Sequence, residues 1–441
     1  MICKDYSKDT RQINAGDIYI GIKGENFDGN LFWKEAFQKG AEAVIIQNID
    51  FDAEDLTEFE NKTIIKVDNT IEALYKIANY KRKLYDIPVI AVTGSVGKTS
   101  TKDIIGNVMK QKYRTLKTEG NNNNNIGMPF TILKLKDEEI AVLEMGMNHL
   151  GEIDLLSKIA EPTISVITNI GTSHIGNLGS RENILKAKLE ILNGMKTKKI
   201  VINNDNDLLH DWYLKNKENF EIITYGIDNK SDVMAKNIQL DESGSIFTCE
   251  YEDTKVEVKV PRGGIHYVYN AICAIAVGLE NNINISEILK GIETVELTKK
   301  RMEIIKLNNG VKLLNDTYNA SFESMQATLK FLECYKENRK IAVLGDMLEL
   351  GEFSEDLHRK VGKQVVDSKI DILICTGEKT KYIIEEAKNK GMKDENIFYF
   401  DNKDEVVKYV KKIWREGDII LFKASNGMKF YDMVTTLSSS F

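Results

Sequence analysis

IAVTGSVGKTST, residues 90–101, is the stretch on which the fold of this chain depends. The apolar run Val89–Val92 predicts a short buried strand, and Gly94 and Gly97 predict a tight turn after it. The residues from Lys98 to about Tyr113 are expected to form a helix that starts at this turn. A strand, a glycine turn and a helix N-terminus in this order predict a phosphate-binding site.

The predicted turn attracts anions because unpaired backbone N–H groups and the helix dipole point at the ligand. Lys98 would reach the β- and γ-phosphates of a nucleotide, and the Thr99 hydroxyl would hold Mg²⁺. The common form of the motif has a glycine where this chain has Val92, so an ordinary glycine-rich turn is the alternative. The residues assigned to nucleotide binding here are Gly94, Ser95, Val96, Gly97, Lys98, Thr99 and Ser100.

The length and composition are those of a globular enzyme with several domains. A chain of 441 residues is too long for one simple core, so two or three domains are expected. The net charge of −7 gives no electrostatic basis for binding nucleic acid or an anionic membrane. The N-terminal MICKDYSKDT lacks the apolar region of a signal peptide, and no apolar stretch is long enough to span a bilayer. We expect a cytoplasmic monomer without membrane insertion.

The cysteines are scattered, and none belongs to a CxxC pair. Most lie in apolar runs, which is typical of reduced core residues in a cytosolic protein. They are Cys3, Cys249, Cys273, Cys334 and Cys375.

The first segment, residues 1–86, is predicted to be a small α/β unit. Thr70 is expected to cap its last helix. The polar loop Gly24–Asn30, GENFDGN, is more typical of a structural turn than of a functional loop. Strands are expected at Asp17–Ile22, Ala43–Gln47 and Thr63–Val67, and helices at Leu31–Lys39 and Ile71–Leu84.

Residues 87–300 are predicted to form a mostly parallel sheet whose strands end in polar residues. Ligands of such sheets bind at the carboxyl ends of the strands. Glu144, Asn169 and His174 are therefore expected to gather near Lys98. Strands are expected at Ile140–Met145, Ile164–Asn169 and Ile200–Asn203, an antiparallel insertion at Val233–Val260, and a buried helix at Tyr267–Leu279.

Residues 301–441 repeat the α/β rhythm without a phosphate loop of their own, which predicts a second doubly wound sheet. Its strands are expected at Val311–Leu314, Ile341–Leu344, Ile372–Cys375, Ile397–Phe400 and Ile419–Phe422.

Two side chains outside the turn are candidates for chemistry. Glu144 supplies the carboxylate that a Mg²⁺–nucleotide site needs, although a solvated acid at a strand end is the alternative. His174 follows a strand at the predicted crevice, which favours a ligand over a structural histidine. Lys188 lies on a helix, where a lysine is normally a solvated charge. His149, His210 and His358 lack such support and are expected at the surface or one layer behind the site.

These motifs together resemble those of the Mur ligase family, and the resemblance covers all three segments. The first segment contains DTRQINAGDIYIGIKGENFDGNLF. The central segment contains TGSVGKTSTKD, TEGNNNNNIGMP, EMGMNHLGEI, TNIGTSHIGNLGSRENILKAKLEI and HYVYNAICA. The last segment contains NDTYNASFESM and GDMLELGE, which point to the branch that adds a dipeptide.

The resemblance implies catalytic roles for Lys98, Glu144, His174 and Lys188. Thr99 and Glu144 would hold one Mg²⁺, and His174 would help to hold a second. Lys188 would serve as a carbamate in a mostly polar crevice, because an ammonium cannot ligate Mg²⁺ whereas an anionic carbamate can.

The resemblance also implies binding roles. Asn270 would contact adenine, and Arg301 and Asp316 would reach the nucleotide from the last segment. The substrate-binding residues would be Thr10, Arg11, Gly24 and Asp28 at the UDP end, Thr118, Asn123 and Asn124 facing the muramyl group, and Asn319 and Ser425. Positions that depart from the family pattern are Asn30, Ser321, Phe322 and the stretch KASN at Lys423–Asn426.

The resemblance thus implies an α/β protein of three domains. A small N-terminal α/β domain (1–86) would bind the UDP substrate, a central P-loop domain (87–300) would bind ATP, and a C-terminal Rossmann-like domain (301–441) would complete the ligase. The activity implied is the ATP- and Mg²⁺-dependent joining of D-alanyl-D-alanine to UDP-N-acetylmuramoyl-tripeptide through an acyl phosphate, in peptidoglycan precursor synthesis. The alternatives are a related ligase that adds a single amino acid, as folylpolyglutamate-type enzymes do, and a non-catalytic nucleotide-binding regulator.

Overall fold

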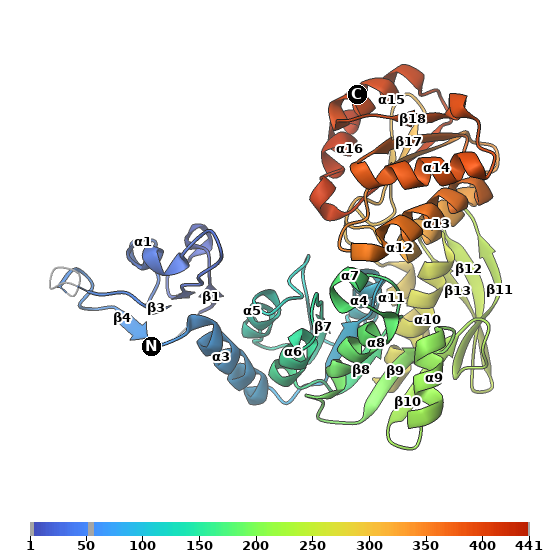
Figure 1. Cartoon of the computed structure of the whole chain (residues 1–441). Coiled ribbons are helices and arrows are strands. Elements are labelled where there is room, and N and C mark those ends of the chain that lie inside the picture. The colour runs from blue at the N-terminus through green and yellow to red at the C-terminus, as the bar shows by residue number, and fades with distance from the viewer. Residues whose placement is uncertain (1–3, 52–56, 440–441) are drawn as a thin grey trace.

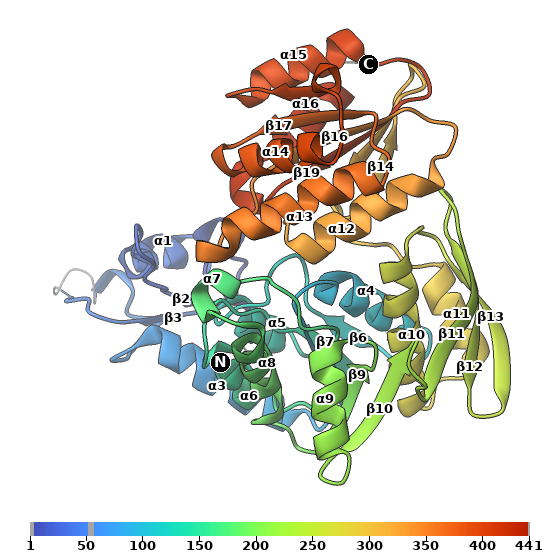
Figure 2. The ribbon, with the colours of Figure 1, turned by 45° about the vertical axis from the view of Figure 1, so that its right-hand side comes forward.

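The computed structural model describes residues 4–51 and 57–439. Its strands form a four-stranded, a nine-stranded and a six-stranded sheet that follow one another along the chain. The N-terminal sheet is set apart to one side, whereas the six-stranded sheet lies above the nine-stranded one (Figure 1; Figure 2).

The N-terminal sheet is parallel, with the strand order β1-β2-β3-β4. Aromatic side chains of α1 and of the loop after β3 pack on one of its faces, with Trp33 against Phe37 and Phe51. Asn69, rather than Thr70, caps the long helix α3, because its side chain accepts from the N–H groups of Ile71 and Glu72. The elements are β1 (Tyr6–Ser7), β2 (Ile18–Ile20), α1 (Trp33–Gln38), β3 (Ala43–Ile46), β4 (Thr63–Lys66) and α3 (Thr70–Leu84).

Arg82, near the end of α3, joins this segment to the central sheet. Its side chain is fully buried, and Nε donates to the carbonyl of Ala160 at 2.8 Å. The two other guanidinium nitrogens donate to the carbonyls of Tyr85, Ile87 and Glu161. A buried cation is tolerated here because carbonyl oxygens satisfy its donors.

We expect Arg82→Met to destabilise the central sheet by about 3 kcal/mol, because it leaves several buried carbonyls without donors. The measurement is the urea midpoint followed by circular dichroism. Lys83→Met is the matched control, since Lys83 is exposed and pairs only with Glu161. Equal midpoints for the two variants would contradict the role given to Arg82.

The central sheet has the order β13-β12-β11-β10-β9-β8-β5-β7-β6. It is parallel from β6 to β11, and β11, β12 and β13 continue it as an antiparallel extension. The strands are β5 (Val89–Thr93), β6 (Thr115–Lys117), β7 (Ile140–Glu144), β8 (Ile164–Ile167), β9 (Lys199–Asn203), β10 (Glu221–Gly226), β11 (Val233–Leu240), β12 (Ser245–Tyr251) and β13 (Thr254–Val260).

The strand β5 lies at the switch point of the central sheet, because the chain builds β6 and β7 on one side of it and β8 to β10 on the other. The helices of the central segment therefore cover both faces of the sheet. The apolar helix α10 is almost entirely buried, as predicted, and packs against α4 and α11. The helices are α4 (Lys98–Met109), α5 (Gly127–Leu133), α6 (Glu152–Ala160), α7 (Ile175–Leu178), α8 (Arg181–Leu189), α9 (Asp207–Asn216), α10 (Ile265–Glu280) and α11 (Ile285–Glu293).

The third sheet has the order β14-β15-β19-β16-β17-β18, and only β14 runs antiparallel to its neighbour. The predicted strands of this segment are present, and β14 is an additional edge strand. The strands are β14 (Glu303–Lys306), β15 (Lys312–Asn315), β16 (Lys340–Gly345), β17 (Ile372–Thr376), β18 (Ile397–Tyr399) and β19 (Ile419–Lys423). The helices are α12 (Phe322–Phe331), α13 (Ser354–Asp367), α14 (Lys381–Asn389), α15 (Lys403–Ile413) and α16 (Tyr431–Ser438).

Cys249, Cys273 and Cys375 are buried with free thiols, whereas Cys334 is only partly buried. Cys3 lies outside the described residues. None of the helices in the described ranges has both the length and the apolar character that a membrane span needs.

Candidate active site

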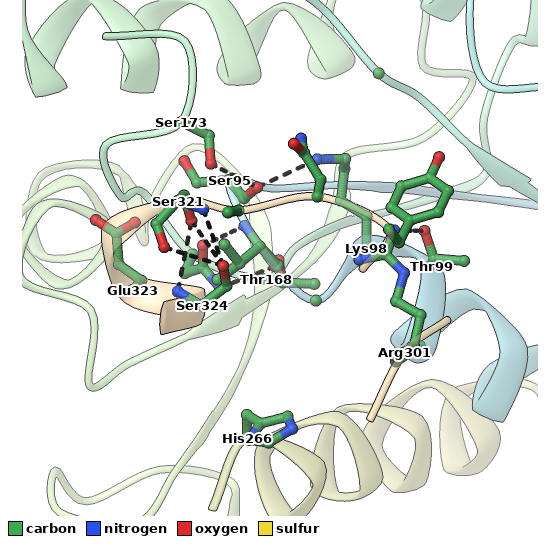
Figure 3. A pocket seen from close by; sticks show the side chains of 18 of the residues that line it. Ser95, Lys98, Thr99, Thr168, Ser173, His266, Arg301, Ser321, Glu323 and Ser324 are labelled. Carbon is green, nitrogen blue, oxygen red and sulfur yellow. Dashed lines mark hydrogen bonds between the residues drawn. The ribbon is translucent and has the colours of Figure 1, made fainter. Parts of the chain in front are cut away.

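A cavity of about 640 Å³ lies where the central sheet meets the third sheet. Its walls come from the turn after β5, from the ends of β7 and β8, from the start of α10, and from loops of the third segment. Figure 3 shows side chains of this cavity, including Lys98, Thr99, Arg301 and Glu323. Glu144, Asn169, His174 and Lys98 all line it, so the expected gathering at the strand ends is present.

The turn after β5 has the backbone that its glycines predict. Gly97 has φ +82° and immediately precedes α4, and a Cβ on Gly94 would lie 1.9 Å from the Thr168 hydroxyl oxygen. Asn169 fastens the turn to the end of β8, since its amide accepts from the Val96 N–H and donates to the Val96 carbonyl, both at 3.0 Å. The glycines and Asn169 therefore hold the turn in the shape of an anion cradle.

Lys98 covers this turn. Its amine donates to the carbonyl of Gly94 at 2.8 Å and to that of Ser95 at 3.3 Å. Burial lowers the pKa of Lys98 to about 8, although the nearby Glu144 carboxylate opposes that shift. A phosphate entering the cradle would replace these two carbonyls as the partner of the ammonium.

Glu144 ends β7 as a buried carboxylate with one unused oxygen. Oε1 accepts from the Thr99 hydroxyl at 3.2 Å and from the Asn123 amide at 2.8 Å. Oε2 is buried and has no hydrogen-bond partner among the described residues. An orphaned buried carboxylate oxygen is costly unless a cation or donor arrives, so this atom fits a Mg²⁺ ligand.

Arg301 brings the third segment onto the phosphate turn. Its Nη2 donates to the Thr99 hydroxyl at 2.9 Å, and its guanidinium lies 3.9 Å from the ring centroid of Tyr318. Asp103, one helical turn beyond Thr99, accepts from the N–H and hydroxyl of Thr298. The helix α4 thus holds the connection between the two sheets at two points.

Asp316 and Lys423 form a buried ion pair at 2.5 Å behind Arg301. Burial alone would raise the pKa of Asp316, but the Lys423 ammonium and the hydroxyl of Thr328 outweigh burial and hold it below its usual value. The same ammonium donates to the carbonyl of Asn319 at 3.2 Å. The pair fixes the loop of the third segment that lines the cavity.

Ser425 and Asn319, the other residues predicted to bind substrate in the third segment, each bond to a neighbouring part of the chain. The Ser425 hydroxyl accepts from the Leu348 N–H at 2.8 Å, and Asn319 accepts from the Asn426 N–H at 3.4 Å. Both side chains line the cavity.

Lys188 does not line the cavity. The prediction that it lies in a mostly polar crevice is therefore wrong. Lys188 is 1% exposed, on α8. Burial lowers its pKa well below the usual value, and the positive charge of Lys98 adds to that shift. A buried, neutral amine is the form of lysine that reacts with carbon dioxide.

Of the three residues predicted to face the muramyl group, two line the cavity and one is buried behind it. Asn123 and Asn124 line the cavity, and the Asn124 side chain also accepts from the N–H groups at the start of α5. Thr118 is fully buried, and its hydroxyl accepts from the Glu144 N–H. It supports Glu144 from behind.

The residues predicted at the UDP end lie on the N-terminal segment, apart from this cavity. Thr10 donates to Glu35, and Arg11 pairs with Asp9 at 2.7 Å. Gly24 and Asp28 close the GENFDGN loop: the Gly24 N–H donates to the carbonyl of Phe27, and Asp28 accepts from Asn30.

His266 and Asn270 contribute unpaired atoms at the start of α10. His266, which sequence reasoning did not single out, lines the cavity with its Nδ1 buried and unpartnered, and burial lowers its pKa to about 4. Asn270 accepts from the Thr101 hydroxyl at 2.9 Å, while its amide nitrogen has no partner among the described residues. These atoms are free to pair with a polar ring edge.

The other histidines separate into three environments. His149 is exposed, and His210 is half-buried with Nδ1 2.9 Å from Asn204 Oδ1. His358 is fully buried rather than at the surface; it accepts from the Met347 N–H at 3.0 Å, one layer behind the cavity.

The described ranges contain no group of three or more His, Cys, Asp or Glu side chains arranged to hold a metal. A metal at the phosphate turn would therefore depend on Glu144, on the Thr99 hydroxyl and on oxygen atoms of a bound phosphate. Such mixed sets of few protein oxygens and substrate phosphates are usual for Mg²⁺.

Three family models match consecutive parts of the chain. They are described as "Mur ligase family, catalytic domain" over residues 6–82, "Mur ligase middle domain" over residues 92–278, and "Mur ligase, glutamate ligase domain" over residues 300–426.

Full-length relatives match as well. The UDP-N-acetylmuramoyl-tripeptide–D-alanyl-D-alanine ligase of Bacillus subtilis (strain 168) is 41% identical over 435 residues, which cover 98% of this chain and 92% of the relative. The crystal structure of MurF from Acinetobacter baumannii superposes with a TM-score of 0.89 at 29% identity, covering 99% of this chain and 93% of that one. MurF ligase from Thermotoga maritima, solved in complex with ADP, gives 0.85 at 27% identity, with coverage of 99% and 97%.

Proposed function

The chain belongs to the Mur ligase family, and we propose that the cavity between its central and third sheets is where ATP activates a substrate carboxylate. The enzyme joins D-alanyl-D-alanine to UDP-N-acetylmuramoyl-tripeptide in peptidoglycan synthesis, at the expense of ATP. The observation that carries this assignment to the cavity is the convergence of Lys98, Glu144 and Arg301 on the phosphate turn.

The reaction has two steps with balanced bonds. A terminal carboxylate oxygen of the tripeptide attacks the γ-phosphorus of ATP, and the bond to the departing ADP oxygen breaks. The amine of the dipeptide then attacks the acyl carbon, phosphate leaves with the electrons of the C–O bond, and the nitrogen gives up a proton. Activation is needed because a carboxylate oxygen is a poor leaving group, whereas phosphate is a good one.

The residues of the cavity would manage negative charge during these steps. Carboxylate and triphosphate repel each other, and Lys98, the N–H groups of the turn and Arg301 supply the opposing charge in a site that excludes water. Asn270 and His266 offer unpaired polar atoms to the adenine side of the nucleotide. Asp316 is already paired with Lys423. Its contribution to nucleotide binding would therefore be indirect, through the loop that this pair holds in place.

The unpartnered Glu144 Oε2 beside the Thr99 hydroxyl fits one Mg²⁺. His174 and a carbamate of Lys188 would hold a second. When bound, the ions would screen the phosphate oxygens and polarise the γ-phosphorus. The buried amine of Lys188 supports the carbamate, because an uncharged amine is both the reactive form and the one that burial favours.

We assign the three sheets to three domains with the boundaries 1–86, 87–300 and 301–441. The N-terminal domain would bind the UDP end through Thr10, Arg11, Gly24 and Asp28, at a distance from the chemistry that a long substrate can span. The third domain would bring the acceptor dipeptide to Asn319 and Ser425. The enzyme would act as a monomer on these small molecules.

We expect phosphate release to require ATP, Mg²⁺, the UDP-muramyl tripeptide and D-alanyl-D-alanine together. A coupled assay for ADP, with each component omitted in turn, measures this. Single amino acids and tripeptides ending in lysine or diaminopimelate form the substrate panel. Equal turnover with D-alanine in place of the dipeptide would favour a ligase that adds single residues, and ATP binding without turnover would favour a regulator.

Ser425→Ala should raise the KM for D-alanyl-D-alanine about 10-fold and leave the KM for ATP nearly unchanged. Its hydroxyl holds the Leu348 N–H in the wall of the cavity, so its loss frees the acceptor-side loop. Ser439→Ala, at an exposed position near the C-terminus, is a control for the substitution itself. A dipeptide KM equal to that of the parent would restrict Ser425 to a structural role.

A further inference from the structure

One short segment of the central domain, residues 171–176, docks against two separate elements of the third segment; it is the loop after β8 and the start of α7. The Thr172 N–H and hydroxyl donate to the two carboxylate oxygens of Glu323, at 2.7 and 3.1 Å. At the far end of the loop, the Gly176 N–H donates to the carbonyl of Glu349 at 3.0 Å. The segment therefore meets α12 at one end and the loop after β16 at the other.

This contact is close enough to exclude side chains on the glycines of the loop. A Cβ on Gly171 would lie 2.6 Å from the carboxyl carbon of Glu323. A Cβ on Gly176 would lie 2.5 Å from the Gly351 nitrogen. The close packing therefore leaves no room for a side chain at either position without a shift of the two segments.

Between these two anchors, His174 meets a carboxylate from the opposite segment. Its Nδ1 lies 2.6 Å from Glu349 Oε2. An ionised carboxylate only accepts, so Nδ1 carries the proton and the lone pair of a neutral ring is left on Nε2. No hydrogen bond among the described residues uses Nε2, and the His174 side chain lines the cavity.

Both residues of this pair have left-handed backbone conformations, with φ +63° at His174 and φ +63° at Glu349. This region costs free energy for a residue other than glycine, and the surrounding contacts must offset that cost. The Gly176 N–H bond to the Glu349 carbonyl and the side-chain pair together provide such contacts.

We propose that Glu349 is a positioning residue that orients His174 from across the interface and fixes its tautomer, so that docking of the third segment completes His174 as a ligand. The proposal rests on the metal role given to His174 above. A histidine that binds a metal usually donates its other ring N–H to a carboxylate, and loss of that partner typically weakens metal affinity 10- to 100-fold. Here the partner lies on a different domain from the histidine, so the ligand is oriented only while the two domains are in contact.

The first test is the metal requirement of the complete enzyme. Glu349→Ala should raise the Mn²⁺ concentration for half-maximal turnover about 10-fold, with kcat recovered at saturating Mn²⁺ and the KM for the dipeptide unchanged. Glu352→Ala is the matched control, since Glu352 lies on the same loop, is exposed and makes no contact that the structure records. Glu349→Gln keeps the volume and should shift the requirement in the same direction.

The second test reads the imidazole directly, without turnover. In protein labelled with ¹⁵N at histidine, His174 should give the chemical shifts of the Nδ1–H tautomer, with the signal assigned from His174→Gln. In Glu349→Ala the ring should move toward the Nε2–H form that free histidine prefers. The same tautomer in both proteins would overturn the proposal, as would a lower Mn²⁺ requirement in Glu349→Ala, which would mean that Glu349 blocks His174.

His174→Ala separates this proposal from the function on which it rests. If His174→Ala raises the Mn²⁺ requirement and Glu349→Ala does not, His174 keeps its metal role and the positioning role of Glu349 is wrong. If His174→Ala leaves the Mn²⁺ requirement unchanged, the metal role of His174 fails, and the positioning of a ligand fails with it.

Discussion

Lys98→Ala should lower kcat about 10³-fold, because it removes a preorganised positive charge from the place where the phosphates would lie. The side chain lies over the phosphate turn, where the ammonium is held by two backbone carbonyls and is ready for an anion. Its loss leaves the triphosphate and the substrate carboxylate to repel each other. The measurement is ADP release under saturating ATP, Mg²⁺, tripeptide and dipeptide.

The fold should survive this substitution, since the turn is fastened by Asn169 and by the backbone rather than by Lys98. An unchanged circular dichroism spectrum and melting temperature would establish that point. Lys134→Ala is the matched control, because Lys134 is a surface lysine of the same domain that pairs only with the exposed Glu119. A folded Lys98→Ala enzyme with near-normal turnover would reject the role.

The elements with strong local patterns could be predicted from the sequence. The glycine turn at residues 94–97 and the all-apolar helix α10 are present because their patterns coincide with their burial. The predicted antiparallel insertion is also present as the hairpins of β11, β12 and β13, with turns at residues 241–244 and 252–253. Local chemistry and tertiary packing agree in these cases.

Short or edge elements carried too little signal. The strand β6 has three residues, of which only Leu116 is buried, and β14 is an antiparallel edge strand with no fully buried residue. The helix α4 ends at Met109, because the N–H groups of Gln111 and Lys112 bond to carbonyls three residues back and tighten the chain. Such endings depend on neighbouring contacts and not on periodicity.

The candidate site was predictable where a motif placed residues at strand ends, and incomplete where partners come from distant segments. Lys98, Thr99 and Glu144 converge as the order of elements requires. Glu349 and Glu323 meet the loop after β8 from more than 100 residues away in the sequence, and no local pattern signals such a contact. Lys188 looked like a solvated helix residue because local sequence does not reveal which face of α8 is buried.

Lys188→Ala should abolish nearly all turnover, a loss of about 10³-fold, if its amine carries the carbamate that helps His174 to hold the second Mg²⁺. The substitution removes the amine on which the carbamate would form. Because Lys188 is buried, the alanine also leaves a cavity, so some loss of stability is expected in addition. Lys188→Met is the matched control: it fills the space without an amine and should be equally inactive but better folded.

The cavity left by Lys188→Ala provides the decisive experiment. Acetate or formate at high concentration can occupy the vacated volume and supply a carboxylate where the carbamate would lie. Turnover should be partly restored in Lys188→Ala, and not in Lys188→Met, where the space is filled, nor in His174→Ala, where a different ligand is missing. A lysine that only packs against its neighbours predicts the opposite order, with Lys188→Met active and no response to acetate, because restored volume rather than restored charge would then recover the enzyme.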